Sequence, residues 1–418
     1  MPQASRDNLK RNLIFNTAGN LIYFLCQWRI TGLLVKSLAD TEDSGIINAG
    51  MLATASSVTN MFMVLAGYGM RNFQVSDING KYSNGDYIRS RVVTVALSFV
   101  LVTGYVFIVG YSPEQTVCIF LFYVWKIIES VTDVFHGIAQ RADRMDIIGI
   151  SYAVRGILSV GGFAAVYSVT GSLNTALGVY AALCLVFSAW YDIFRNRGYY
   201  TPMGPVDKDS IRRLLIECLP LALYAFCTTT TGTIPKLFLG RIWGDSVMGI
   251  YGLVDSPVLV LQVGVALLFG PFVVRFARMY NEGNREGFLK LTGIISACVA
   301  GLTAVCVVGA MILGKFGLRI LYGSSVAEYD YLLPLMVICA GLTALMQLLC
   351  TLLTVVRCMK GLLISTASSM ALSAAASMVL VPRGGLTGTS AAAITAIAFE
   401  IAMLGYFLLK TVRARDHN

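Results

Sequence analysis

Long apolar stretches recur along the chain, and short polar turns separate them. A membrane helix needs roughly 20 apolar residues to cross the hydrocarbon core of a bilayer, and this chain supplies such stretches repeatedly. The pattern therefore predicts an all-α integral membrane protein with twelve transmembrane helices. The expected spans are 13–36, 44–69, 91–111, 116–138, 147–168, 173–194, 214–239, 246–272, 290–313, 331–355, 361–381 and 388–410.

A polar linker divides the twelve spans into two sets of six. We expect an N-terminal six-helix bundle at residues 1–200 and a C-terminal six-helix bundle at residues 201–418. Because each half holds an even number of spans, the two halves would share one orientation in the membrane, as parallel repeats do. The polar interruptions are too short to form a separate catalytic or nucleotide-binding domain.

The distribution of Lys and Arg predicts the orientation. Of the 32 such residues, 23 lie in turns on the side that holds the N-terminus and five lie on the opposite side. Turns rich in Lys and Arg stay in the cytoplasm, so both termini are expected there. The same bias accounts for the net charge of +9 without a nucleic-acid partner.

Several chemistries are excluded by composition. The ten cysteines lie in or beside apolar stretches and form no CxxC pair, and the chain has only two histidines, so neither a metal site nor a cofactor is expected. The motif GxxxxGK[ST] is absent, which excludes ATP hydrolysis within this chain as the energy source.

Ionisable side chains gather in the fourth span. Such a residue inside a span costs about 2.5–3.5 kcal/mol on insertion scales and often marks a transport pathway. Lys126, Glu129, Asp133 and His136 follow one another at steps of three, four and three, so they share one helical face. That face must meet protein or water. The alternative is that Lys126 and Glu129 pair with each other or hold a neighbouring helix.

Three further cations lie within other spans. Arg29 and Arg155 have no opposite charge within one helical turn, and a guanidinium matches the forked geometry of phosphate oxygens. An ion pair across helices, for instance Arg155 with Asp133, is the alternative. Lys236 lies near the outer end of its helix, from where it could instead extend to the interface. The candidate substrate-binding residues are Arg29, Arg155, Lys236 and Lys126.

The carboxylates within the spans are candidate sites for a coupling ion. These are Asp133, Glu129, Asp255 and Glu400. Each could bind H+ or Na+, or could serve only as a counter-ion to the cations and leave a uniporter.

Three stretches carry a family resemblance: "GYGMRNFQVSD" (67–77), "ESVTDVFHGIAQRADRMDIIGIS" (129–151) and "IPKLFLGRIWGDSVMGIYG" (234–252). With the twelve-span plan, they resemble the polysaccharide flippases (Wzx-like) of the multidrug/oligosaccharidyl-lipid/polysaccharide exporter superfamily. The resemblance implies two six-helix bundles that form a V around a central cavity in the bacterial cytoplasmic membrane. It implies movement of an undecaprenyl-diphosphate-linked oligosaccharide, such as an O-antigen unit of lipopolysaccharide or a capsule unit, from the inner to the outer leaflet.

We therefore expect a transporter rather than an enzyme, acting as a monomer with polysaccharide polymerase machinery as a candidate neighbour. One alternative is a drug or cation antiporter of the same superfamily, but its cationic substrates would need an acidic cavity, and the cations in the spans argue against one. Another is a membrane polymerase or acyltransferase. The outer loops are short, and the longest, residues 315–330, contains no histidine for such chemistry.

Overall fold

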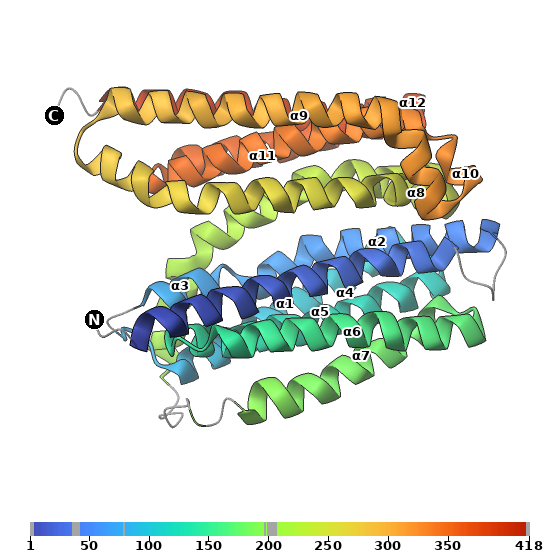
Figure 1. The fold of residues 1–418 in the computed structure, drawn as a ribbon, viewed down its shortest axis with the longest axis horizontal. Helices are drawn as coiled ribbons and strands as arrows, with labels where there is room; N and C mark the ends of the chain where they lie inside the picture. The colour runs from blue at the N-terminus through green and yellow to red at the C-terminus, as the bar shows by residue number, and fades with distance from the viewer. Residues whose placement is uncertain (1–3, 36–41, 78–79, 196–197, 199–206, 415–418) are drawn as a thin grey trace. The chain divides into compact units, whose positions relative to one another are not determined.

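The computed structural model describes residues 4–35, 42–77, 80–195, 198 and 207–414. These residues contain helices and no strand, so the all-α prediction is confirmed (Figure 1). The helices are α1 (Ala4–Val35), α2 (Glu42–Gly67), α3 (Met70–Ser76), α4 (Asn84–Val109), α5 (Pro113–Arg141), α6 (Met145–Thr170), α7 (Leu173–Ser188), the π-helix η1 (Ala189–Phe194), α8 (Lys208–Asn281), α9 (Arg285–Tyr322), α10 (Ser324–Ala327), the 3-10 helix η3 (Asp330–Leu332), α11 (Leu333–Val355) and α12 (Met359–Ala414).

Eight helices of the described chain are long and apolar enough to cross a membrane, judged by length and composition. Two of them are each a pair of helices, because α8 leaves helical geometry at Gly244 (φ 85°) and α12 at Gly385 (φ 51°). Glycine adopts such positive φ values without steric cost. The more polar α1 and α5, of 32 and 29 residues, complete twelve helices of spanning length, in agreement with the twelve predicted spans.

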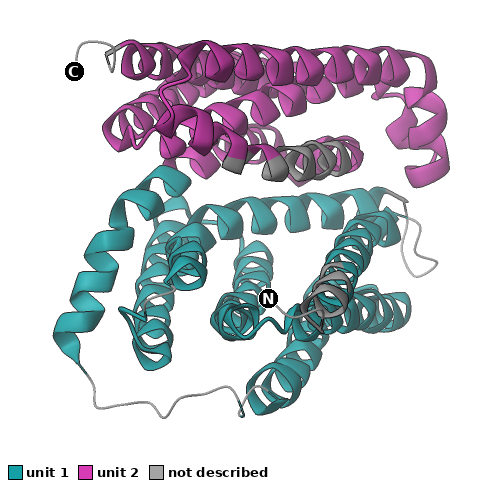
Figure 2. Ribbon diagram, turned by 60° about the vertical axis from the view of Figure 1, so that its left-hand side comes forward, with its two compact units in different colours: residues 1–226 teal, residues 227–418 magenta. Residues whose placement is uncertain are grey.

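The chain divides into two compact units, residues 1–226 and 227–418, and the division falls within α8 (Figure 2). In the first unit α1 packs along α6, α2 lies against α4 and α5, and α7 lies against α5 and α6. In the second unit α11 packs along α9 and α12. The predicted domain boundary, between residues 200 and 201, lies outside the described residues, and the V-shaped cavity stays a prediction.

Helices α1 and α6 approach each other through glycine. A Cβ added at Gly149 would lie 2.0 Å from the carbonyl oxygen of Phe15, and one added at Gly19 would lie 2.0 Å from the carbonyl oxygen of Gly149. Membrane helices pack closely where small residues let the two backbones approach. This contact holds α1 against α6, the helix that contains Arg155.

Serine hydroxyls link helices within the second unit. Ser369 Oγ donates to the carbonyl oxygen of Ala396 at 2.8 Å, which links the two halves of α12. Ser373 Oγ donates to the carbonyl oxygen of Thr231 at 2.7 Å, which links α12 to α8. Neutral side-chain hydrogen bonds of this kind connect membrane helices without burying charge.

Candidate functional site

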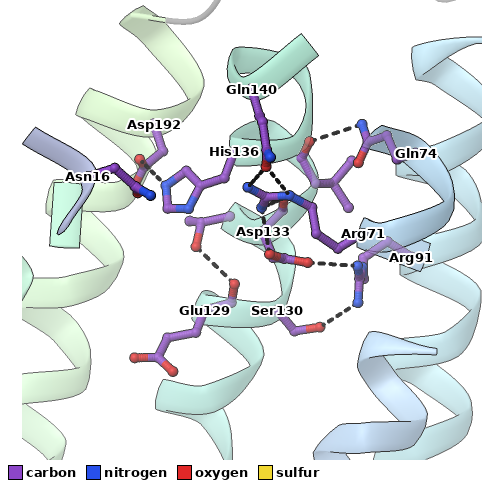
Figure 3. Close-up of polar contacts among 12 residues, drawn as sticks. Asn16, Arg71, Gln74, Arg91, Glu129, Ser130, Asp133, His136, Gln140 and Asp192 are labelled. Carbon is purple, nitrogen blue, oxygen red and sulfur yellow. Dashed lines mark hydrogen bonds and ion pairs between the residues drawn. The ribbon is translucent and has the colours of Figure 1, made fainter. Parts of the chain in front are cut away.

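The polar stripe of α5 lies at the centre of the first unit. Ser112 caps the helix by accepting from the N–H of Gln115, and Pro113 occupies its first turn, where the missing N–H costs nothing. Side chains from α1, α3, α4 and η1 meet the stripe (Figure 3). The predicted face therefore meets protein rather than lipid.

Asp133 neutralises two arginines. Its carboxylate lies 2.7 Å from Arg71 Nη1 on α3 and 3.2 Å from Arg91 Nη2 on α4 (Figure 3). Arg71 Nη2 also donates to Gln140 Oε1 at 2.8 Å, and Arg91 Nη1 donates to the carbonyl oxygen of Ala66 at 2.8 Å. The Arg91 side chain is only 2% exposed, so its charge depends on Asp133 for compensation. Asp133 thus joins α3, α4 and α5.

His136 pairs with an acid of η1. Its Nε2 lies 3.0 Å from Asp192 Oδ1, and both residues are fully buried (Figure 3). The ring of His136 meets the ring of Tyr152 edge to face, with centroids 5.2 Å apart. Asp192 belongs to a six-residue π-helical stretch, a geometry that often occurs at functional sites.

Lys126 and Glu129 pair with each other. The ammonium group lies 2.7 Å from Glu129 Oε2, and the hydroxyl of Tyr23 on α1 donates to Glu129 Oε1. Lys126 also sits 4.1 Å from the centroid of the Trp125 ring, within the range of a cation–π contact. The pairing that the sequence left open between these two residues is therefore present.

Arg155 on α6 is 1% exposed and incompletely bonded. Its Nη1 donates to Thr132 Oγ1 at 3.0 Å, and its guanidinium lies 5.1 Å from the centroid of the Tyr152 ring. Its Nη2 has no hydrogen-bond partner among the described residues. The alternative ion pair with Asp133 is not formed there, because Arg71 and Arg91 hold that carboxylate.

Arg29 stands apart from this cluster. It is exposed on α1 and forms no hydrogen bond or ion pair with a described residue. Its neighbour Gln27 donates to the hydroxyl of Tyr180 at 3.1 Å. Two residues along a helix turn the side chain by about 200°, so Arg29 lies on the face away from that contact.

The second unit holds the other candidates. Lys236 Nζ lies 2.6 Å from Asp255 Oδ2. Lys236 therefore pairs with an acid instead of extending to the membrane interface. The two residues flank Gly244 and so join the two helices of α8. Glu400 is fully buried, and neither carboxylate oxygen has a hydrogen-bond partner among the residues that the structure describes.

Sequence reasoning missed Arg71, Arg91 and Asp192. Arg71 was counted with the turn after the second apolar stretch. Arg91 was counted with the turn before the third, because the apolar stretch of α4 begins beside it. A signal was present, since Arg91, Thr94 and Ser98 recur at helical spacing and all three are buried.

Twelve helices of spanning length define a multi-pass integral membrane protein, and charged groups buried among such helices are typical of a transport pathway. The fold is similar to a structure described as the lipid II flippase MurJ in its inward closed conformation (TM-score 0.67, 11% identity, 96% of this chain and 90% of that chain). It is also similar to the Vibrio cholerae MATE transporter VcmN in its bent form (TM-score 0.58, 10% identity, 99% of both chains). The predicted all-α membrane fold with twelve helices is confirmed.

The family follows from sequence. Residues 45–276, more than half of the chain, match the family described as "Polysaccharide biosynthesis protein". The chain belongs to this family. It is 23% identical over 325 residues to the capsular polysaccharide biosynthesis protein CapF of Staphylococcus aureus, a match that covers 77% of this chain and 80% of that one.

Proposed function

We propose that this protein is a flippase that moves an undecaprenyl-diphosphate-linked oligosaccharide, a unit of surface polysaccharide, from the inner to the outer leaflet. Family membership and the similarity to CapF support the polysaccharide context. The fold supports movement by alternating access, in which two six-helix bundles open a V-shaped cavity first to one side and then to the other. Both termini are in the cytoplasm of a bacterium, and the chain acts as a monomer.

One observation carries the proposal: Arg155 is a buried guanidinium with an unused N–H donor. An arginine N–H buried without an acceptor is costly, and a phosphate oxygen is the acceptor that its geometry suits. Lys126 lies near Arg155 and is held by Glu129 in this conformation. When the cavity opens, Arg155 and Lys126 bind the diphosphate, while Arg29 and Lys236 contribute further positive charge.

The experiment replaces Arg155 with glutamine, which keeps a donor and removes the charge. Export of the lipid-linked unit is expected to fall at least tenfold while the protein reaches normal levels in the membrane. Lys290→Gln removes an exposed cation in the second unit and is the matched control. Normal export by the Arg155 variant, or failure of that variant to accumulate, would show that Arg155 is structural and that the diphosphate is bound elsewhere.

A coupling ion, H+ or Na+, is proposed to bind a carboxylate. Glu129, Asp133 and Asp255 each have a cationic partner, whereas Glu400 has none among the described residues, so Glu400 is the leading candidate. Proteoliposomes with ion gradients imposed one at a time test this. Glu400→Gln is expected to abolish the response to the coupling gradient and to leave exchange without a gradient intact.

The membrane potential contributes as well. Two negative charges that cross 100 mV uncompensated gain roughly 4–5 kcal/mol. A potassium–valinomycin potential should therefore change both the rate and the final leaflet distribution of labelled substrate. An unchanged distribution at either sign of the potential would rule out electrogenic movement.

A further inference from the structure

The first three turns of α8 carry a stripe that changes from cationic to apolar. This part of α8 belongs to the first unit (Figure 2). Lys208 and Arg212 lie one turn apart, and the same face continues with apolar side chains toward Leu219. Together with Tyr68 at the end of α2, the stripe lines a pocket of about 300 Å³. The apolar lining residues of α8 are Ile211, Leu215, Ile216 and Leu219.

The two cations of the stripe are available. Asp207 lies 3.7 Å from Arg213, and Glu217 lies 2.6 Å from Lys81, so these two acids serve other cations. The third nearby acid, Asp209, is exposed in the first turn of α8 and forms no ion pair with a described residue. A hydrogen bond from the Ser210 hydroxyl holds the pKa of Asp207 below its ordinary value, which keeps that acid ionised beside Arg213. Neither cation of the stripe forms an ion pair with a described residue.

The dimensions of the stripe match one leaflet. Eleven residues separate Lys208 from Leu219, and a helix rises 1.5 Å per residue, so the stripe is about 16 Å long. The hydrocarbon core of a bilayer is about 30 Å thick, so one leaflet contributes about 15 Å. A stripe of this length is long enough for its cations to reach lipid phosphates while its apolar lining lies along an acyl chain. The positive end of the helix macrodipole adds to the attraction for an anion.

We propose that this pocket binds an anionic phospholipid of the leaflet that faces the N-terminus. The two cations hold the phosphate and head group, and one acyl chain lies along the apolar face beside Tyr68. Charge complementarity selects an anionic lipid over a zwitterionic one, because a basic pocket at the level of the head groups gains from each added negative charge. A bound lipid would tie the start of α8 to the membrane surface. This lipid would bind whichever substrate the protein carries.

The test measures lipid binding to the purified full chain by native mass spectrometry. The probes are phosphatidylglycerol, phosphatidylethanolamine with the same acyl chains, and soluble glycerol phosphate. Phosphatidylglycerol is expected to bind tightest. The double variant Lys208→Gln/Arg212→Gln should bind it about 25-fold more weakly, at about fivefold per cation. The matched control Arg278→Gln/Lys290→Gln removes two exposed cations outside the pocket and should bind phosphatidylglycerol as the parent does.

A third variant keeps the cations and fills the apolar part. Ile216 is 56% exposed, so Ile216→Trp should fold normally and still exclude the acyl chain, weakening phosphatidylglycerol binding at least fivefold. Equal binding of the two phospholipids, or unchanged binding in both the double variant and Ile216→Trp, overturns the proposal. Competition by glycerol phosphate at the concentrations at which the lipid binds would make this an anion site without a lipid, and would overturn it as well.

Discussion

The two units solve the problem of burying polar groups in different ways. The first unit buries charge: Arg71 and Arg91 share Asp133, His136 pairs with Asp192, and Arg155 lies beside them. The second unit is built with hydroxyls, such as Ser369 and Ser373, that donate to backbone carbonyls of neighbouring helices. Its charged contact among the described residues is the pair of Lys236 with Asp255.

The difference separates two roles. A network of paired charges needs every partner in place, so the first unit is held in a specific arrangement around an incompletely bonded arginine. Hydroxyl contacts are weaker individually and can be exchanged for others, so the second unit tolerates change more easily. We expect substitutions of charged residues to damage the first unit more than the second.

The largest effect is expected at Asp133. Asp133→Ala leaves Arg71 and the buried Arg91 without a counter-charge, and breaking a buried ion pair in this way costs about 3–5 kcal/mol. Asp255→Ala in the second unit should cost less, because Lys236 is 30% exposed. Thermal unfolding of the purified proteins measures both. An equal loss in the two variants would contradict the contrast between the units.

Glycine contacts test the packing of each unit. A Cβ at Gly149 would lie 2.0 Å from a backbone oxygen, which cannot move alone, and Gly149→Ala should cost about 1–3 kcal/mol. A Cβ at Gly309 in the second unit would meet no atom within 4 Å. Gly309→Ala should therefore cost under about 1 kcal/mol. If the contact between α1 and α6 is loose, Gly149→Ala should lose no more stability than the variant of the second unit.

The two glutamates provide a comparison at constant shape. Glu129→Gln loses the charge that holds Lys126 and should cost about 1.5–3 kcal/mol, the range for hydrogen bonds to charged groups. Glu400→Gln keeps the shape of a buried side chain that forms no ion pair with a described residue, so it should cost less, under about 1.5 kcal/mol, the upper range for a neutral hydrogen bond. Denaturation in detergent measures both. A large loss at Glu400 would show that its charge is compensated.

The smallest effect concerns Asp77, in the turn after α3. Burial raises the pKa of this carboxyl, but hydrogen bonds from the N–H groups of Tyr82 and Lys81 outweigh it and leave the pKa below its ordinary value. A depressed folded pKa stabilises the protein above the unfolded pKa of about 3.9 and loses that contribution as the pH falls through the folded value. Asp77→Asn should therefore be slightly less stable than the parent at pH 7 and equal to it at low pH. A difference that persists below the folded pKa would contradict this origin.

Much of the fold was predictable from local pattern. The apolar stretches marked the helices, because each must satisfy its own backbone in lipid wherever its neighbours lie. The spacing of Lys126, Glu129, Asp133 and His136 placed them on one face, because helical periodicity is a local property. The pairing of Lys126 with Glu129 was predictable for the same reason, since the two residues are one turn apart.

Only the tertiary structure decided the partners of the other charges. Asp133 meets Arg71 and Arg91, which are 62 and 42 residues away, and His136 meets Asp192 at a separation of 56 residues. The sequence offered Arg155 only as an alternative partner of Asp133, and packing instead brought α3 and α4 to that carboxylate. The physical reason is that a helix's own sequence determines which of its faces is polar, whereas the helix that meets this face is determined by how all the helices of the unit pack together.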